Sequence, residues 1–227
     1  MKSAVILFPG SNREQDAARA LRAASGAAPA IVWHAEPDLP PGTDLVVLPG
    51  GFSYGDYLRC GAIAARSPAM RAVARHAERG GLVLGICNGF QILCEAGLLP
   101  GVLMRNANRR FLCRMQHVRV ENAGTPFTRG YAEGQVARFA IAHGEGNFEA
   151  DDATIEAIED AGQIAFRYCD ASGRVDQAAN PNGSQRNIAG VFNSRFNVLG
   201  LMPHPENLID PLVGGIDGRP LFEALAG

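Results

Sequence analysis

Short apolar segments alternate with amphipathic stretches along most of the chain. Apolar runs at 4–8, 31–33, 45–48, 82–84, 188–192 and 198–202 predict buried strands. The stretches at 14–24, 68–79 and 154–161 have helical patterns. Strands that alternate with helices are joined by right-handed crossovers, so we expect an α/β fold with a mostly parallel central sheet and helices on both faces.

The pattern changes between residues 99 and 136. Pro100-Gly101 interrupts it, and 111–120 has the pattern of an extended segment. We interpret this part as a small antiparallel excursion, after which 136–142 returns to the core. No repeat, low-complexity tract or linker interrupts the chain, so we expect one domain over residues 1–227.

The stretch at 80–97, GGLVLGICNGFQILCEAG, predicts a buried strand that turns sharply into a helix ending at Gly97. Cys87 lies at this turn, where a strained backbone can hold a side chain above the sheet edge. Gly85 and Gly89 allow close approach, and the amides of the first helical turn favour a thiolate. A lone cysteine is more often structural, so the turn by itself leaves both interpretations open.

Two adjacent glycines, Gly50 and Gly51, follow the apolar run at 45–48. Ligands of open α/β sheets bind at the carboxyl ends of the strands, where free backbone amides can stabilise an oxyanion. A glycine-rich turn without function is the commoner explanation when such a pair stands alone.

The last apolar run ends in Met202-Pro203-His204-Pro205-Glu206. Two prolines favour an extended backbone, in which positions two apart point to the same side, so Glu206 can orient the imidazole of His204. Cys87 and His204 both follow apolar strands, and such strand ends meet at one edge of a parallel sheet. Cys87, His204 and Glu206 therefore suit acyl transfer through a thioester. His76 lies within a predicted helix and is expected to be solvated.

The composition is that of an ordinary globular chain. Of 227 residues, 47% are hydrophobic and 19% charged, and the net charge of −2 gives no sign of a general nucleic-acid or membrane binder. The apolar run at 4–8 is shorter than a signal-peptide core, and we expect a first core strand there. Five cysteines without a C-x-x-C spacing argue against a disulfide framework or a zinc site, and favour a reducing, cytoplasmic compartment.

The basic residues are unevenly distributed. Lys2 is the only lysine, which excludes a P-loop, so any ATP that the reaction needs is expected on another polypeptide. The arginines between residues 105 and 119 suit a solvated face, a substrate phosphate or an acidic partner; they are Arg105, Arg109, Arg110, Arg114 and Arg119.

The glycines of HGEGNF at 143–148 lack the dinucleotide-binding spacing, and we expect a loop at the substrate edge.

Several motifs together resemble one family over essentially the whole chain. The family is the class I glutamine amidotransferases, with a flavodoxin-like fold, and within it the glutaminase subunits of phosphoribosylformylglycinamidine synthase. The motifs are FPGSNRE (8–14), GGFSYGDYLRCGAIA (50–64), GICNGFQIL (85–93), AHGEGNF (142–148), NPNGS (180–184) and MPHPEN (202–207).

The resemblance implies a role for each matching residue. It implies a nucleophile, base and orienting acid at Cys87, His204 and Glu206. The expected oxyanion and glutamine contacts are the amides of Gly51 and Asn88, the side chain of Gln91, and the backbone of His143 and Gly144. No metal or cofactor is implied in this chain.

The implied reaction is hydrolysis of glutamine to glutamate and ammonia. The ammonia would pass to a large synthetase subunit, which uses ATP and magnesium to convert formylglycinamide ribonucleotide to the amidine. A small bridging subunit is also implied.

Two other hypotheses fit parts of the pattern. A stand-alone cysteine hydrolase or peptidase could use the same strand–helix turn, but it would leave the loops FSYGDYLRCGA (52–62) and HGEGNF (143–148) without a purpose. A non-catalytic regulatory subunit would have no need of Cys87, His204 and Glu206 together.

Overall fold

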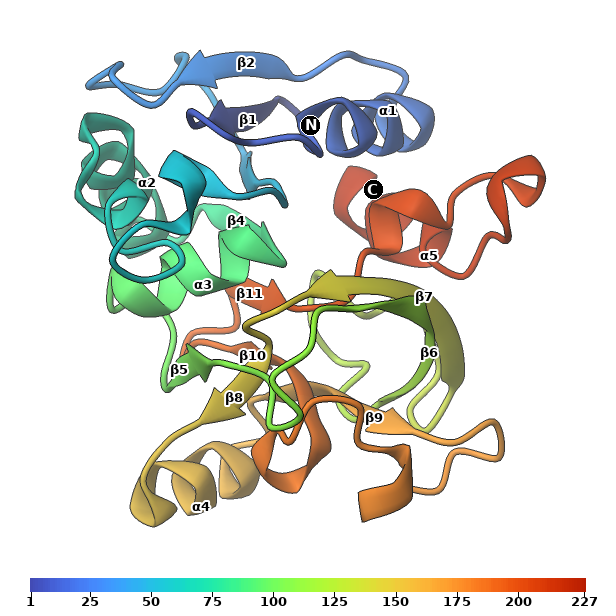
Figure 1. Ribbon diagram of the computed structural model, residues 1–227. Coiled ribbons are helices and arrows are strands. Elements are labelled where there is room, and N and C mark those ends of the chain that lie inside the picture. Colours follow the sequence, from blue (N-terminus) through green and yellow to red (C-terminus); the bar gives the residue numbers. More distant parts are fainter.

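A mixed sheet of nine strands forms the centre of the computed structural model, which describes residues 1–227 (Figure 1). The strand order is β2-β1-β3-β4-β11-β10-β9-β6-β7. These strands are β1 (Ser3–Leu7), β2 (Ala30–Trp33), β3 (Leu45–Leu48), β4 (Leu82–Ile86), β6 (Leu112–Val120), β7 (Val136–His143), β9 (Ile164–Cys169), β10 (Ile188–Phe192) and β11 (Val198–Leu201). A separate two-stranded antiparallel sheet pairs β5 (Val102–Met104) with β8 (Asn147–Glu149).

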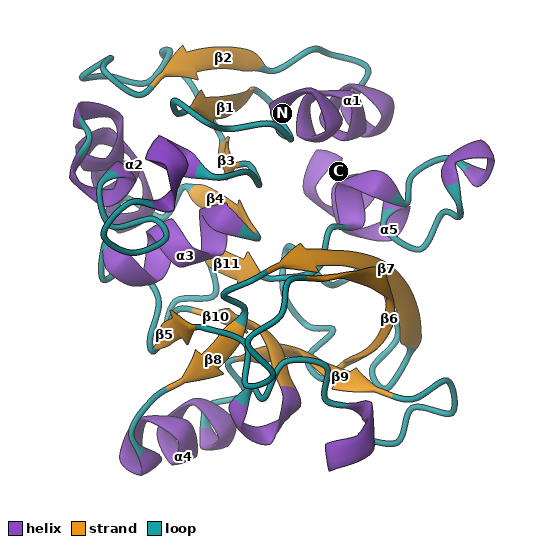
Figure 2. Cartoon of the chain, in the orientation of Figure 1, coloured by secondary structure: helices purple, strands orange, loops and turns teal.

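The first half of the sheet, from β2 to β11, is parallel. Every residue of β3 and β11 is buried, because helices cover both faces of this half. On one face lie α2 (Pro68–Glu78) and α3 (Asn88–Glu95), and on the other α1 (Glu14–Ser25) and α5 (Arg219–Ala226), while α4 (Asp152–Asp160) lies near β8 (Figure 2). The predicted α/β fold class is confirmed.

The antiparallel part is larger than the predicted small excursion. Strands β10, β9, β6 and β7 all pair antiparallel and extend the same sheet. The connection between β10 and β11 covers only 193–197, which is too short for the crossover that a parallel pair needs. This hairpin reverses the chain direction and makes the sheet mixed.

The antiparallel half curves back over the parallel half. Although β7 is at the far end of the strand order, Ala140 of β7 forms an isolated bridge with His204, which follows β11 (Figure 1). The backbone N–H of His204 donates to the carbonyl oxygen of Ala140 at 2.8 Å. The curvature therefore places β7 over the ends of β4 and β11.

The expectation that His76 is solvated is wrong. His76 is 6% exposed, and its Nε2 lies 3.3 Å from the carbonyl oxygen of Leu82, the first residue of β4. It belongs to the last turn of α2, which packs against the start of that strand.

No helix in the structure has both the length and the apolar character needed to span a bilayer.

Gly89 is required by the close approach of α3 to β3. A Cβ at this position would lie 2.0 Å from the carbonyl oxygen of Leu48 and 2.9 Å from its Cβ. We expect Gly89→Ala to reduce the free energy of unfolding by about 1–3 kcal/mol, because backbone must move to admit the methyl group. Denaturant unfolding measures this loss. Gly124→Ala is the control, since its Cβ would meet only the Asn122 Oδ1 at 3.4 Å, and an equal effect there would contradict the argument.

Candidate active site

Cys87 occupies the junction between β4, which ends at Ile86, and α3, which begins at Asn88. Its φ of 51° and ψ of −105° lie in a region that residues with a side chain rarely adopt. Its backbone N–H donates to the carbonyl oxygen of Leu201 in β11 at 2.8 Å. Its Sγ lies 3.7 Å from the carbonyl oxygen of Ala142 in β7. The strained turn expected from the sequence is present, and neighbouring strands hold it on two sides.

His204 and Glu206 follow β11, the parallel neighbour of β4. Leu201 lies opposite Ile86 in the register, so both chain segments leave the sheet at the same edge, as predicted. The Nδ1 of His204 lies 2.6 Å from the Oε1 of Glu206, and both side chains are buried.

The backbone between them differs from the expectation. It is not extended, because Pro205–Asn207 form a short 3₁₀ turn. Proline fits the first position of such a turn, where its fixed φ is suitable and its missing N–H costs nothing. The turn, rather than strand alternation, brings the carboxylate of Glu206 to the imidazole of His204.

The electrostatics of His204 favour its protonated form. Burial lowers the pKa of His204, but the charges of Glu206 and Cys87 outweigh burial and hold this pKa well above its ordinary value of 6.5. The Nδ1 faces Glu206, and the Nε2 is buried without a hydrogen-bond partner. The carboxylate therefore fixes the orientation of the ring, and Nε2 is the atom available to exchange a proton with the thiol.

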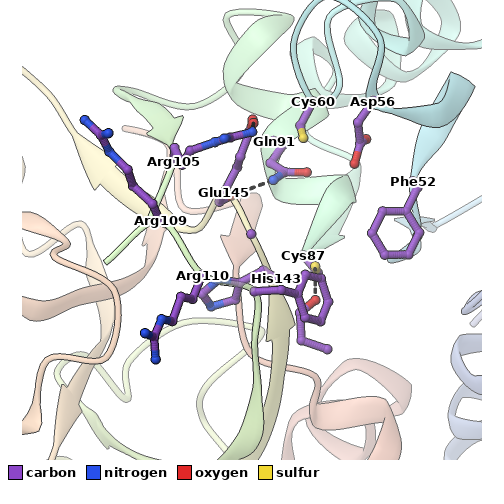
Figure 3. Close-up of a pocket in the computed structure, with 14 residues that line it drawn as sticks. Phe52, Asp56, Cys60, Cys87, Gln91, Arg105, Arg109, Arg110, His143 and Glu145 are labelled. Carbon is purple, nitrogen blue, oxygen red and sulfur yellow. Dashed lines mark hydrogen bonds and ion pairs between the residues drawn. The ribbon is translucent and has the colours of Figure 1, made fainter. Parts of the chain in front are cut away.

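A cavity of about 350 Å³ opens beside Cys87 (Figure 3). Four other predicted site residues line it: Gly51, Gln91, His143 and Gly144. A smaller cavity of about 150 Å³ adjoins it, sharing Cys87 and Gly51, and is lined by His204 as well. These volumes suit a small-molecule substrate.

Comparison with known proteins places this site in a family. A family model for CobB/CobQ-like glutamine amidotransferase domains matches residues 1–215. The chain is 64% identical to the phosphoribosylformylglycinamidine synthase subunit PurQ of Bradyrhizobium diazoefficiens, over 100% of this chain and 97% of the relative. It is 59% identical to that of Rhodospirillum rubrum, over 99% of this chain and 98% of the relative. The chain belongs to the PurQ family.

Solved structures agree with this assignment. A chain in the structure of PurLQS from Thermotoga maritima matches with a TM-score of 0.86 and 42% identity, covering 99% of this chain and 96% of that one. A glutamine amidotransferase of the same organism matches with a TM-score of 0.55 at 17% identity, covering 99% of this chain and 90% of that one, which supports the fold alone. The predicted class I glutamine amidotransferase fold is therefore confirmed.

Asn88 and Gln91 are linked in a chain of hydrogen bonds. The Asn88 Oδ1 accepts from the backbone N–H of Ser53 at 3.2 Å, and its Nδ2 donates to the Gln91 Oε1 at 2.9 Å. The Gln91 Nε2 donates to the carbonyl oxygen of Glu145 at 2.6 Å. The Asn88 side chain thus supports the cavity wall and does not line it, which leaves its backbone amide as the group predicted to contact an oxyanion.

Asn106 is a residue of this site that the sequence analysis missed. Its Oδ1 accepts from the backbone N–H of Gly146 at 3.0 Å and lies 3.1 Å from the Nδ1 of His143. Its Nδ2 donates to the carbonyl oxygens of Arg110 and His143 at 2.8 and 2.9 Å. Asn106 therefore fixes the loop at 143–146. No motif marks it, because its function depends on contacts with a segment almost 40 residues away.

His143 is held in its neutral form. Burial and the nearby charge of His204 lower the pKa of His143 to about 4. A neutral imidazole beside the His204 imidazolium avoids placing two positive charges in one buried site.

The arginine cluster expected between residues 105 and 119 is divided in the structure. Three of its members, Arg105, Arg109 and Arg110, line the larger cavity (Figure 3). Arg114 instead donates to Gln116, and Arg119 forms an ion pair with Glu121 at 2.6 Å. Of the five arginines, only the first three line the cavity beside Cys87.

Proposed function

We propose that this chain hydrolyses L-glutamine to glutamate and ammonia through a thioester on Cys87. The proposal depends most on one observation: in a PurQ-family chain, Cys87 lies at a strained strand–helix junction and lines the same cavity as His204, whose Nδ1 is 2.6 Å from Glu206. A thiol, an imidazole and an orienting carboxylate are the groups that acyl transfer from an amide requires.

In the proposed first half-reaction, the proton of the Cys87 thiol is already on the Nε2 of His204, which gives the imidazolium that Glu206 stabilises, and the sulfur attacks the amide carbon of glutamine. The amides of Gly51 and Asn88 stabilise the negative oxygen of the tetrahedral intermediate. His204 returns its proton to the nitrogen as the carbon–nitrogen bond breaks, which releases ammonia and leaves the γ-glutamyl thioester.

In the second half-reaction, water attacks the thioester carbon and His204 accepts its proton. The carbon–sulfur bond then breaks, glutamate leaves, and the proton returns to the sulfur of Cys87. Glu206 keeps the Nδ1–H of the ring directed toward itself throughout, so that Nε2 always faces the reacting atoms.

The ammonia serves a synthetase in this proposal. Because the relatives are subunits of phosphoribosylformylglycinamidine synthase, we infer that a large subunit, PurL, uses the ammonia to convert formylglycinamide ribonucleotide to formylglycinamidine ribonucleotide in de novo purine biosynthesis. A small bridging subunit, PurS, completes the assembly, in line with the PurLQS structure of the Thermotoga relative.

In this scheme ATP and Mg²⁺ bind to PurL and not to this chain, because amide hydrolysis through a thioester needs no cofactor. We place the reaction in the cytoplasm, where the five cysteines, all free in the structure, stay reduced.

The decisive experiment combines the purified chain with PurL and PurS from the same organism. Glutamate release from glutamine is expected to rise about tenfold or more when ATP and the ribonucleotide are added, since binding at the synthetase then favours the reactive state. Absence of glutamate release under all conditions would contradict the proposal. Efficient cleavage of peptides by the chain alone would instead favour a stand-alone hydrolase.

A further inference from the structure

Asp56 is a carboxylate in the larger cavity that the proposed chemistry does not use. It is partly buried, and its Oδ1 is buried without a hydrogen-bond partner. Burial raises the pKa of Asp56, a contact with the Cys60 thiol lowers it in part, and the charge of Glu145 raises it further. No cationic side chain stabilises its charge.

A second carboxylate, Glu145, lies close to the first. Burial, a hydrogen bond that the thiol donates to Glu145, and the charge of Asp56 all raise the pKa of the Cys60 thiol, which places this thiol near both acids. The only ion pair of Glu145 is a long one, 3.9 Å to the Nη2 of Arg105, whose side chain is 71% exposed. The two acids therefore repel each other inside a cavity, and a bound cation would relieve the repulsion.

Charged side chains of both signs lie at one end of the cavity. In Figure 3, Asp56, Cys60 and Glu145 gather on one side, away from Cys87. Arg105, beside Glu145, supplies positive charge on the same side, whereas the side chains of Arg109 and Arg110 extend away from Cys87 in Figure 3. A ligand with a free ammonium and a free carboxylate at one end, and a neutral group that reaches Cys87 at the other, fits this arrangement.

We propose that Asp56, assisted by Glu145, binds the α-ammonium group of the amino-acid substrate and makes the site selective for free α-amino acids. This inference rests on the proposed function, in which the neutral amide end of glutamine lies at Cys87. Two methylene groups separate that end from the α-carbon, so the charged end lies further along the cavity, toward Asp56. The ammonium donates a charge-assisted hydrogen bond to the unpaired Oδ1.

Asn is the matched replacement for Asp56. The φ of Asp56 is 55°, a left-handed conformation that Asp and Asn both adopt readily, and the two side chains have the same shape. Asp56→Asn thus removes the charge with little change in the backbone. Asp56→Glu keeps the charge and serves as the conservative variant, and Asp38→Asn, at a side chain 83% exposed outside the cavity, is the surface control.

The test compares glutamine with glutaramate, which is glutamine without its α-amino group. Ammonia release from both substrates is measured with the complex that this chain forms with PurL and PurS. Asp56→Asn is expected to raise the KM for glutamine roughly 10- to 100-fold with kcat changed less than about threefold, because a lost charge-assisted contact acts mainly on binding. The preference for glutamine over glutaramate should be smaller in Asp56→Asn than in the wild type by the same factor. Asp56→Glu should retain part of this preference.

The outcomes separate this inference from the function on which it rests. An unchanged preference in Asp56→Asn would overturn the role of Asp56, as would an equal loss with both substrates or an equal effect of Asp38→Asn. If the wild-type complex releases no ammonia from glutamine, the proposed function itself fails. Thermal unfolding of each complex establishes that the variants are folded, and the partial rescue by Asp56→Glu gives a second, independent readout.

Discussion

Replacement of Cys87 by alanine is expected to abolish glutamine hydrolysis while leaving ammonia-dependent synthesis by the complex intact. Without the sulfur no thioester forms, and loss of a covalent nucleophile lowers such rates by roughly 10⁴-fold or more. Alanine removes only the Sγ, which lies 3.7 Å from the carbonyl oxygen of Ala142, so the β4–α3 junction should keep its backbone. Ammonia added from solution bypasses the missing step.

The measurement is synthesis of the amidine product by the complex with glutamine or with ammonium chloride as nitrogen donor. Cys94→Ala is the matched control, because Cys94 lies in α3, the helix that directly follows Cys87, and is 9% exposed, but lines neither cavity. Loss of both activities in a folded Cys87→Ala complex would contradict a pure donor role. A thioester trapped on another cysteine of the wild type would contradict the assignment of the nucleophile.

The replacement Glu206→Gln is expected to lower kcat for glutamine hydrolysis by roughly 10²- to 10⁴-fold, because it removes the charge that orients and supports the imidazolium of His204. Glutamine and glutamate have the same shape, so packing is retained. Glu206 is one of the two charges that hold the pKa of His204 well above 6.5. Its removal lowers that pKa, so the imidazolium loses its proton at a lower pH than in the wild type.

The pH dependence tests this sign. A raised pKa keeps His204 protonated through neutral pH, and in Glu206→Gln the high-pH limit of this protonated range should move toward lower pH. The NMR chemical shifts of the His204 ring report the titration directly, and kcat reports the catalytic loss. Glu223→Gln, an exposed position in α5, is the control. An unchanged titration of His204 in Glu206→Gln would show that the 2.6 Å contact does not set its charge.

The sequence by itself determined the local features of this protein. Apolar runs such as 45–48 identified the strands, because a strand buried on both faces must be apolar throughout. Glycines at 85 and 89 marked the sharp turn at Cys87, since a Cβ at either position would lie within 3 Å of neighbouring atoms. The segment Pro203-His204-Pro205-Glu206 after the last apolar run then identified His204 and Glu206, and the motif resemblance agreed, although the extended backbone expected between them was wrong.

The tertiary structure alone decided what surrounds the sulfur. That β4 and β11 are neighbours follows from the sheet order, and the curvature of the antiparallel half then brings Ala140 to His204 and Ala142 to Cys87. The same folding lets Asn106 fix the loop at 143–146 and divides the arginines between a cavity and a surface. Periodicity records which side of an element is buried, but not which element buries it. Contacts between segments far apart in the chain are therefore fixed only when the whole sheet has closed around its core.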